Sequence, residues 1–420
     1  MVRLFIFCVC ADHHPDSPTR KGRVMSLPLQ GIKVVELGQL IAGPFAAKIF
    51  AEFGAEVIKV EPPLTGDPLR KWRLLHKGTS VWWAVQSRNK QSVTLDLHQP
   101  QAQEMARRLI RDADVLIENF RPGTLESWGL GWEELHALNP KLIMLRVSGY
   151  GQTGPYRDRP GFGVIGEAMG GLRHLSGEAG RTPVRVGVSI GDSLSALHGV
   201  IGVLLALRHR EQNDGEGQQI DVALYESVFN VMESLIPEYS VFNVVREPAG
   251  SSMPGIAPTN AYRCNDGKYT LIAGNGDSIY RRLMEKIGRM DLANDPELEH
   301  NDGRVRHVAR IDAAISTWTA ERSLDEVLAA LNEARIPAGK IYDAADIAGD
   351  PHYQARDMLL QSALDDGTPV TLPGIVPKLQ DTPGQVRMPA PTLGQHTDTV
   401  LEAHGIDAAT RAEWRRLGII

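Results

Sequence analysis

The sequence predicts an α/β protein with two domains, a large one built around a parallel sheet and a smaller one of α+β type. In the first half of the chain, short β-rich runs alternate with amphipathic helical stretches, which is the pattern of a parallel sheet covered by helices. Near residues 249–258 two glycines and two prolines interrupt the chain, which indicates a linker into a second unit. The 420 residues suffice for about two or three domains.

The large domain takes its expected strands from runs rich in β-branched residues. These strands are Lys33–Leu37, Glu56–Glu61, Ser92–Leu95, Val115–Glu118, Leu142–Val147 and Gln219–Leu224. The helices expected around them are Pro44–Phe53, Pro100–Arg111, Trp132–Leu138, Ser193–His209 and Glu226–Tyr239. Pro44 is placed at the first helical position, where a missing N–H costs nothing. The alternation predicts a Rossmann-like domain, but no G-x-G-x-x-G follows the first strand, so nicotinamide or flavin binding has no support.

The chain divides into five expected segments. They are a disordered leader at 1–25, the first part of the large Rossmann-like domain at 26–225, a linker helix at 226–248, the small α+β domain at 249–347 and a C-terminal segment at 348–420. In the small domain we expect the strand Lys268–Ala273 and the helices Ile279–Ile287, Arg310–Thr319 and Leu324–Ala334. The tail has a β-rich stretch at Val370–Pro377 and a helix from His396 to His404.

Composition excludes several classes of protein. Hydrophobic residues make up 42%, charged residues 23%, and the mean hydropathy is -0.20, as in an ordinary soluble protein. A net charge of -6 argues against nucleic-acid binding. The apolar run Leu4–Cys10 is too short to span a membrane, and three cysteines do not make a disulfide framework. We therefore expect a cytoplasmic protein with no nucleic-acid or membrane partner.

The common catalytic motifs are missing from the sequence. It contains no H-E-x-x-H or C-x-x-C spacing, so we expect no metal site. It also has no G-x-S-x-G elbow and no G-x-x-x-x-G-K-[ST] loop, which removes the usual hydrolase and nucleoside-triphosphatase interpretations.

A series of short motifs nevertheless runs through the chain. They are Leu37–Pro44, Phe53–Pro62, Gly66–Pro68, Asn89–Leu97, Glu118–Gly123, Gly187–Asp192 and Leu393–Thr397. In this order and spacing they resemble the signatures of the class III CoA-transferases, the family of formyl-CoA transferase and carnitine CoA-transferase. The resemblance extends from about Leu27 to the C-terminus.

The resemblance implies that Asp192 is the catalytic nucleophile. From the residues alone, an Asp before Ser193 and an apolar helix is what a helix N-cap looks like. The two interpretations are compatible, because a carboxylate at a helix N-terminus is favoured in its charged form. By resemblance, Asp192 forms mixed anhydrides and an aspartyl-CoA thioester, with CoA thioesters as substrates and no permanently bound cofactor.

The resemblance also assigns a set of CoA-binding residues. They are Gln39, Ile41, Ala42, Lys90, Leu95, Asn119, Phe120 and Arg121. Arg121 is the first candidate for a phosphate contact, because a guanidinium offers a planar fork of donors, and Lys90 is the second. On sequence alone, an Arg before Pro-Gly is more often an ordinary solvated loop residue. Some family members have an Arg where this chain has Pro62, so part of their phosphate contact is missing or replaced here.

One departure from related sequences bears on the reaction. The α-methylacyl-CoA racemases of the superfamily use a G-H-D segment for proton transfer, whereas this chain has Gly161-Phe162-Gly163, which offers no general base. Racemase activity is therefore not expected. Transferases commonly have an acidic residue at the position of Gly163, and whether nearby Glu167 replaces it stays open.

A second departure bears on the substrate. Where formyl-CoA transferase has four consecutive glycines in a lid, this chain has Gly250–Pro258, with Gly255 as the expected lid residue. This segment is more similar to that of members acting on dicarboxylates. We therefore expect CoA transfer, with succinyl-CoA as a candidate donor, to a dicarboxylate acceptor. A carnitine-like or other monocarboxylate transferase and a non-catalytic CoA-binding subunit remain the alternatives.

The assembly is likewise implied by the resemblance. It is a homodimer of two interlocked rings, in which the 348–420 segment returns to the large domain. In such a dimer the lid at Gly255 acts on the partner's active site.

Overall fold

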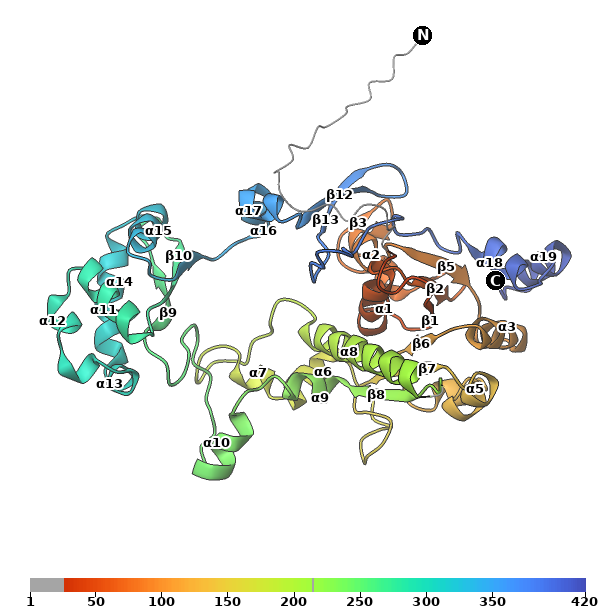
Figure 1. The fold of residues 1–420 in the computed structure, drawn as a ribbon, viewed down its shortest axis with the longest axis horizontal. Helices are drawn as coiled ribbons and strands as arrows, with labels where there is room; N and C mark the ends of the chain where they lie inside the picture. The colour runs from red at the N-terminus through yellow and green to blue at the C-terminus, as the bar shows by residue number, and fades with distance from the viewer. Residues whose placement is uncertain (1–25, 214) are drawn as a thin grey trace, which may run out of the picture.

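The large domain is built on a six-stranded sheet in which all neighbouring strands are parallel (Figure 1). The computed structural model describes residues 26–213 and 215–420, so the predicted disordered leader at 1–25 lies outside the described residues. The strand order is β5-β2-β1-β6-β7-β8. The strands are β1 (Lys33–Glu36), β2 (Glu56–Glu61), β5 (Lys90–Thr94), β6 (Val115–Glu118), β7 (Ile143–Ser148) and β8 (Gln219–Ala223). The winding direction reverses between β1 and β6, where a doubly wound sheet places its ligand site.

Helices cover both faces of the sheet, as the α/β pattern predicts. One face is packed by α1 (Ala42–Glu52) and α8 (Ile190–Gln212). The other is packed by α3 (Pro100–Arg111), α5 (Trp132–Leu138), α18 (Thr397–Ala403) and α19 (Ala408–Arg416). All six residues of β7 are buried, which is expected of a central strand covered on both sides.

Three differences from the predicted helices bear on the site. Helix α1 begins at Ala42, so Pro44 is its third residue rather than its first, still within the turn that needs no N–H. Helix α8 begins at Ile190, so Asp192 lies inside the first turn and is not the N-cap. The single helix expected at Glu226–Tyr239 is two helices, because Glu233 has a φ of +53° and interrupts the helical path. They are α9 (Leu224–Phe229) and α10 (Leu235–Phe242).

The small domain has a hydrophobic core of its own. Its sheet has the order β11-β10-β9, with antiparallel pairs. The elements are β9 (Thr259–Arg263), β10 (Tyr269–Ala273), α11 (Asp277–Lys286), α12 (Met290–Ala293), α13 (Asn301–Arg306), α14 (Val308–Ala320), α15 (Leu324–Glu333) and β11 (Ala338–Lys340). Figure 1 shows this unit standing apart from the six-stranded sheet, with one stretch of chain leading out to it and another leading back.

The chain beyond the small domain returns to the large sheet. It forms α16 (Ala344–Gly349), α17 (Pro351–Ala355) and the hairpin of β12 (Leu359–Ala363) and β13 (Pro369–Pro373). The Asn89 side chain accepts hydrogen bonds from the backbone N–H groups of Arg387 and Met388, and Thr397 Oγ1 accepts one from Thr94 N–H. The edge strand β5 is therefore covered by the C-terminal segment. The domain boundaries at 225, 248 and 347 stay predictions.

The remaining elements connect the strands of the large domain. They are β3 (Leu75–His76), β4 (Thr79–Ser80), α2 (Val81–Gln86), α4 (Thr124–Ser127), α6 (Gly163–Met169) and α7 (Leu172–Leu175), with a short 3₁₀ turn at Pro68–Lys71. A second 3₁₀ turn, Pro296–Leu298, lies in the small domain between α12 and α13. Among the described residues, α8 is the one helix whose length and composition would allow it to cross a membrane. Its Ala196, Val200 and Val203 are buried against the sheet, as in a core helix.

Candidate active site

A cleft of about 270 Å³ lies at the carboxyl ends of the strands, at the switch point between β1 and β6. It is lined by Gln39, Leu40, Ala42, Asn119, Phe120, Arg121, Pro122, Val147, Ser148, Gly149, Arg159, Gly161, Phe162, Asp192 and Leu224. Asp192 thus lies in one cleft with Gln39, Ala42, Asn119, Phe120 and Arg121. The predicted nucleophile and five of the eight predicted CoA-binding residues share a site.

Asn119 fixes the loop after β1 by hydrogen-bonding both backbone groups of one residue, Gln39. Its Oδ1 accepts a hydrogen bond from Gln39 N–H at 2.7 Å, and its Nδ2 donates to Gln39 O at 2.8 Å. Gly38 allows this approach, because a Cβ there would come within 3.1 Å of Asn119 Oδ1. The Asn119 oxygen and one of its two N–H donors are therefore committed to the loop, so Asn119 shapes the cleft and keeps one N–H for a ligand.

A buried cluster of charged residues supports the same loop. We call it the Lys59 cluster, and it consists of Lys59, Glu36, Asp67 and Lys90. Lys59 Nζ donates to Gly38 O at 2.8 Å and forms ion pairs with Glu36 and Asp67, each at 2.9 Å. Asp67 in turn accepts a hydrogen bond from Leu40 N–H. Burial opposes the charge on Lys59, but Asp67 and Glu36 outweigh it, so the pKa of Lys59 is raised.

Lys90 belongs to this cluster and not to the cleft. Its side chain is completely buried, its Nζ donates to Pro44 O at 2.8 Å, and it lies 2.7 Å from Glu36 Oε2. Burial lowers the pKa of Lys90 to about 8, against the opposing effect of Glu36. The expectation that Lys90 contacts a CoA phosphate is wrong for this structure, because the ammonium faces the interior below the loop.

Two further predicted CoA-binding residues lie beside the cleft. Leu95 lines an adjoining pocket with Pro62 and Trp128, and this pocket shares Gln39 and Phe120 with the cleft. Ile41 is buried at the N-terminus of α1 and lines neither. The adjoining pocket and the cleft form a connected surface, along which an extended ligand could reach Asp192.

Two arginines supply positive charge to the cleft. Arg121 is exposed, and its guanidinium makes no hydrogen bond or ion pair with any residue in the described part of the chain. Arg159, which sequence reasoning missed, stacks on the ring of Tyr156 at 3.6 Å. It belongs to an irregular Gly- and Pro-rich stretch, whose path the sequence does not reveal. Both guanidiniums line the cleft and offer planar sets of N–H donors.

Asp192 is half-buried in the first turn of α8. Burial and then the negative charge of Glu167 raise the pKa of Asp192 to about 6, against a smaller opposing effect of Arg185. The backbone of α6 lies directly against the carboxylate, because a Cβ built on Gly163 would overlap Asp192 Oδ2. A carboxylate with few solvent contacts is a good nucleophile once it is ionised.

Glu167 lies one helical turn beyond Gly163 and is completely buried. It has two guanidinium partners, Arg173 Nε at 3.3 Å and Arg185 Nη2 at 3.8 Å. An acidic side chain at position 163 would collide with Asp192, and Glu167 is the acidic residue nearby. Neither arginine was singled out from the sequence, because the contact depends on how the stretch between β7 and α8 folds.

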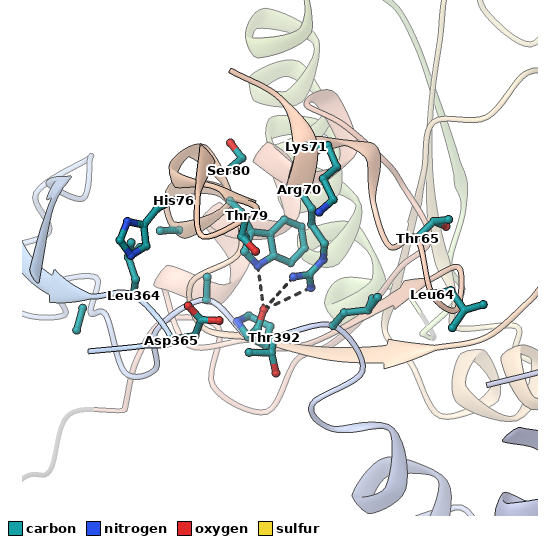
Figure 2. Close-up of a pocket in the computed structure, with 16 residues that line it drawn as sticks. Leu64, Thr65, Arg70, Lys71, His76, Thr79, Ser80, Leu364, Asp365 and Thr392 are labelled. Atoms are coloured by element: carbon teal, nitrogen blue, oxygen red, sulfur yellow. Dashed lines mark hydrogen bonds between the residues drawn. The ribbon is translucent and has the colours of Figure 1, made fainter. Parts of the chain in front are cut away.

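A second pocket lies between the β3–β4 hairpin, α2 and the returning C-terminal segment (Figure 2). Arg70 and Trp83 Nε1 both donate hydrogen bonds to Pro391 O, and Arg70 also binds Glu61 through two donors at 2.8 Å. These contacts attach the C-terminal segment to the sheet. The pocket contains no residue of the Asp192 site.

The predicted lid residue Gly255 does not line the cleft within this chain. It precedes β9, and its carbonyl accepts a hydrogen bond from Asn301 Nδ2. As for metals, no group of three or more His, Cys, Asp or Glu side chains that could share an ion occurs within 26–213 and 215–420.

Comparison with known proteins relates this chain to CoA-transferases. The model of CoA-transferase family III matches residues 29–397. A succinyl-CoA--D-citramalate CoA-transferase of Chloroflexus aurantiacus is 48% identical over 88% of this chain and 92% of its own length. A succinate--glutarate CoA-transferase of Agrobacterium fabrum is 35% identical over 92% of this chain and 96% of its own length.

A solved structure shows the same fold. A CAIB/BAIF family protein from Brucella suis matches 90% of this chain and all of its own chain, with a TM-score of 0.80 and 33% identity. These findings confirm the resemblance stated from the motifs and the α/β class with a parallel central sheet. This chain belongs to CoA-transferase family III and is an acyl-CoA:carboxylate CoA-transferase.

Proposed function

We propose that this enzyme moves CoA from succinyl-CoA to a C4–C5 dicarboxylic acid, with Asp192 as the nucleophile. The observation that carries the proposal is the half-buried Asp192 in a cleft at the switch point of the sheet. Relatives at 48%, 45% and 35% identity are named for transfer from succinyl-CoA to D-citramalate or L-malate and for transfer between succinate and glutarate. Their acids share two carboxylates on a short carbon chain.

The reaction begins when a carboxylate oxygen of Asp192 attacks the thioester carbonyl of the donor. The C–S bond breaks, and the products are a mixed anhydride on Asp192 and CoA thiolate. The thiolate then attacks Asp192 Cγ, which releases the donor acid as a carboxylate and leaves an aspartyl-CoA thioester. The acceptor carboxylate attacks the same carbon and expels the thiolate. The thiolate finally attacks the acceptor acyl carbon, which frees Asp192. No proton is gained or lost overall.

The CoA thioester would occupy the connected surface beside Gln39 and Phe120. In this arrangement the adenine end lies in the pocket of Leu95 and Trp128, and the thioester lies at Asp192. Arg121 would bind phosphate oxygens, because its guanidinium lines the cleft and makes no hydrogen bond or ion pair with the described residues. The enzyme would need no permanent cofactor, since the donor is already an activated thioester and each intermediate on Asp192 passes that activation on to the acceptor acid.

The proposed assembly is a cytoplasmic homodimer of interlocked rings, in which Gly255 serves the partner's site. Helix α8 supports a dimer, because Leu197, Ile201, Leu204 and Leu205 form an exposed apolar stripe at helical spacing. Two relatives are named as the alpha and beta subunits of a succinyl-CoA--L-malate CoA-transferase, which favours a hetero-oligomer as the second candidate. The sedimentation mass and the transfer activity of the purified chain together distinguish the two, because a homodimer is active at twice the chain mass, whereas a chain that needs a different subunit is inactive alone.

The test of the proposal is covalent trapping. We expect succinyl-CoA followed by hydroxylamine or borohydride to modify Asp192, as detected by peptide mass spectrometry. Transfer to glutarate, malate and citramalate should exceed transfer to acids of one carboxylate. An unmodified Asp192 with every thioester donor would overturn the proposed chemistry, and a panel in which no dicarboxylate reacts above background would overturn the proposed substrate class.

A further inference from the structure

Asp192 and three charged residues near it form one group, and those three lie outside the CoA cleft. Asp192 and Glu167 are acidic, and Arg173 and Arg185 are basic, so the formal charges of the four sum to zero. Neither Glu167 nor either arginine lines the cleft that holds Arg121 and Phe120. The guanidinium of Arg185 therefore lies close to Asp192 but apart from the surface proposed for CoA.

The pairing within this group is loose. Arg185 Nη2 is 3.8 Å from Glu167 Oε1, too long for a hydrogen bond, and Arg185 makes no hydrogen bond with any residue in the described ranges. Arg173 donates a single one, at 3.3 Å. Glu167 Oε1 is buried and has no hydrogen-bond partner among these residues. A guanidinium has five N–H donors, so most of those on these two arginines are available.

Other buried glutamates show what a complete pair looks like in this protein. Arg146 Nε donates to Glu118 Oε1 at 2.7 Å, and Arg70 binds Glu61 through two donors at 2.8 Å. A buried carboxylate oxygen without a partner costs free energy, so loose pairing persists where another group is to be bound. The group that Arg173 and Arg185 can bind must be an anion, because a guanidinium offers only donors.

We propose that Arg185, supported by Arg173, binds the carboxylate of the substrate that does not react, and thereby selects dicarboxylates. The inference rests on the proposed function, since it assigns a recognition residue to that same site. Arg185 is near enough to Asp192 to oppose the rise in its pKa. An acid with two carboxylates on a short chain places one at Asp192 Cγ while the other meets the guanidinium. A monocarboxylate makes only the first contact.

Two properties of Arg185 suit this role. Its side chain is 48% exposed, so an incoming acid can reach it, whereas the Arg173 side chain is 24% exposed and lies closer to Glu167. Arg173 thus balances Glu167, and Arg185 keeps the charge that the substrate meets. A charge-assisted contact to a guanidinium contributes more than a neutral hydrogen bond.

The experiment compares Arg185→Gln with Arg181→Gln. Arg181 lies in the same loop, and its side chain is 77% exposed, 3.7 Å from Glu178, so it is a matched control. We expect Arg185→Gln to raise the KM for glutarate at least about tenfold, because one charged contact is lost. The KM for butyrate should stay unchanged. Where butyrate turns over too slowly, its inhibition constant replaces its KM. Arg185→Lys should recover part of the loss, and Arg181→Gln should behave as wild type.

Each outcome has a separate meaning. Equal effects of Arg185→Gln on both acids, or no effect on glutarate, would overturn the role of Arg185 while the wild-type enzyme still transferred CoA. Failure of the wild type to form any adduct at Asp192 would instead overturn the proposed function. The change must appear in the KM for the dicarboxylate with the melting temperature unchanged, because a merely structural arginine would alter both.

Discussion

Two groups of charged residues in the large domain differ in how completely they are paired. In the Lys59 cluster, Lys59 lies 2.9 Å from both Glu36 and Asp67 and also donates to a backbone carbonyl. Around Asp192, the two arginine contacts to Glu167 are 3.3 and 3.8 Å long. The same residue types thus serve two purposes. Complete pairing fixes the loop that shapes the cleft, and incomplete pairing leaves groups free for substrate.

Removing the nucleophile should separate activity from stability. We expect Asp192→Asn to lower kcat by a factor of roughly a thousand or more, because the covalent intermediates are lost. The folded pKa of about 6 lies above the usual value of Asp, so ionised Asp192 destabilises the folded protein as pH rises from about 4 through 6. The variant should therefore melt a few degrees higher at pH 7 and no higher at pH 4.

These two readouts are measured by steady-state transfer and by calorimetry at both pH values. Ser193→Ala is the matched control, since Ser193 is the next residue of α8 and its hydroxyl bonds only to Ser189 O. A lower melting temperature for Asp192→Asn at pH 7 would mean that Asp192 is paired like the Lys59 cluster, and the comparison would fail.

Breaking the Lys59 cluster should have the opposite profile. We expect Lys59→Met to lower the free energy of unfolding by about 3–5 kcal/mol, because Glu36 and Asp67 are left buried without their shared partner. Chemical denaturation measures this loss. Lys286→Met, which removes an exposed pair with Glu333, should cost less than about 1 kcal/mol. Equal losses in the two variants would contradict the assignment of a structural role to the Lys59 cluster.

Releasing the loop above that cluster should affect CoA binding more than turnover. Asn119→Ala removes both hydrogen bonds to Gln39, so the loop loses its fixed position. We expect the KM for the CoA thioester to rise about tenfold, the effect of one or two net hydrogen bonds. Asn213→Ala, at the exposed end of α8, serves as the control. An unchanged KM would show that the loop keeps its shape without Asn119.

The smallest expected effect concerns pH. Because Asp192 must be ionised to attack, kcat/KM should fall as pH drops through about 6. Glu167→Gln removes a negative neighbour that raises this pKa, so the acid limb should move to lower pH by up to about one unit. Glu178→Gln, on an exposed loop, should leave the limb in place. An acid limb that moves to higher pH would show that Glu167 acts mainly by holding Arg185 near Asp192, where the arginine lowers the pKa of the nucleophile.

Periodicity in the sequence was enough to predict the sheet, and matched motifs were enough to predict the cleft. The spans of β2, β6, α3 and α5 agree with prediction, because their apolar patterns end at clear polar residues. The predicted start of α8 was wrong because its N-cap, Ser189, makes no side-chain capping hydrogen bond. No capping signature in the sequence therefore marks where the helix begins. The prediction that Lys90 binds CoA was wrong, because the position of Lys90 in the motif does not reveal that its side chain points into the interior.

The arginines around Asp192 could not be predicted for a different reason. Arg159, Arg173 and Arg185 come from the Gly- and Pro-rich stretch between β7 and α8, where no period sets the direction of a side chain. Their convergence depends on how α6 and α7 fold against α8 and α9. Asp192 itself was found by family resemblance, since its local sequence fits an ordinary helix start.

Gly163 constrains the order in which this enzyme could change during evolution. A side chain at position 163 and the nucleophile in its present place exclude each other, because a Cβ there would occupy the space of Asp192 Oδ2. Gaining a side chain at position 163, such as the acidic one common among transferases, would require the Asp192 carboxylate to shift first or at the same time. The two positions can therefore change only together, and the empty space at Gly163 ties the choice of one residue to the placement of the other.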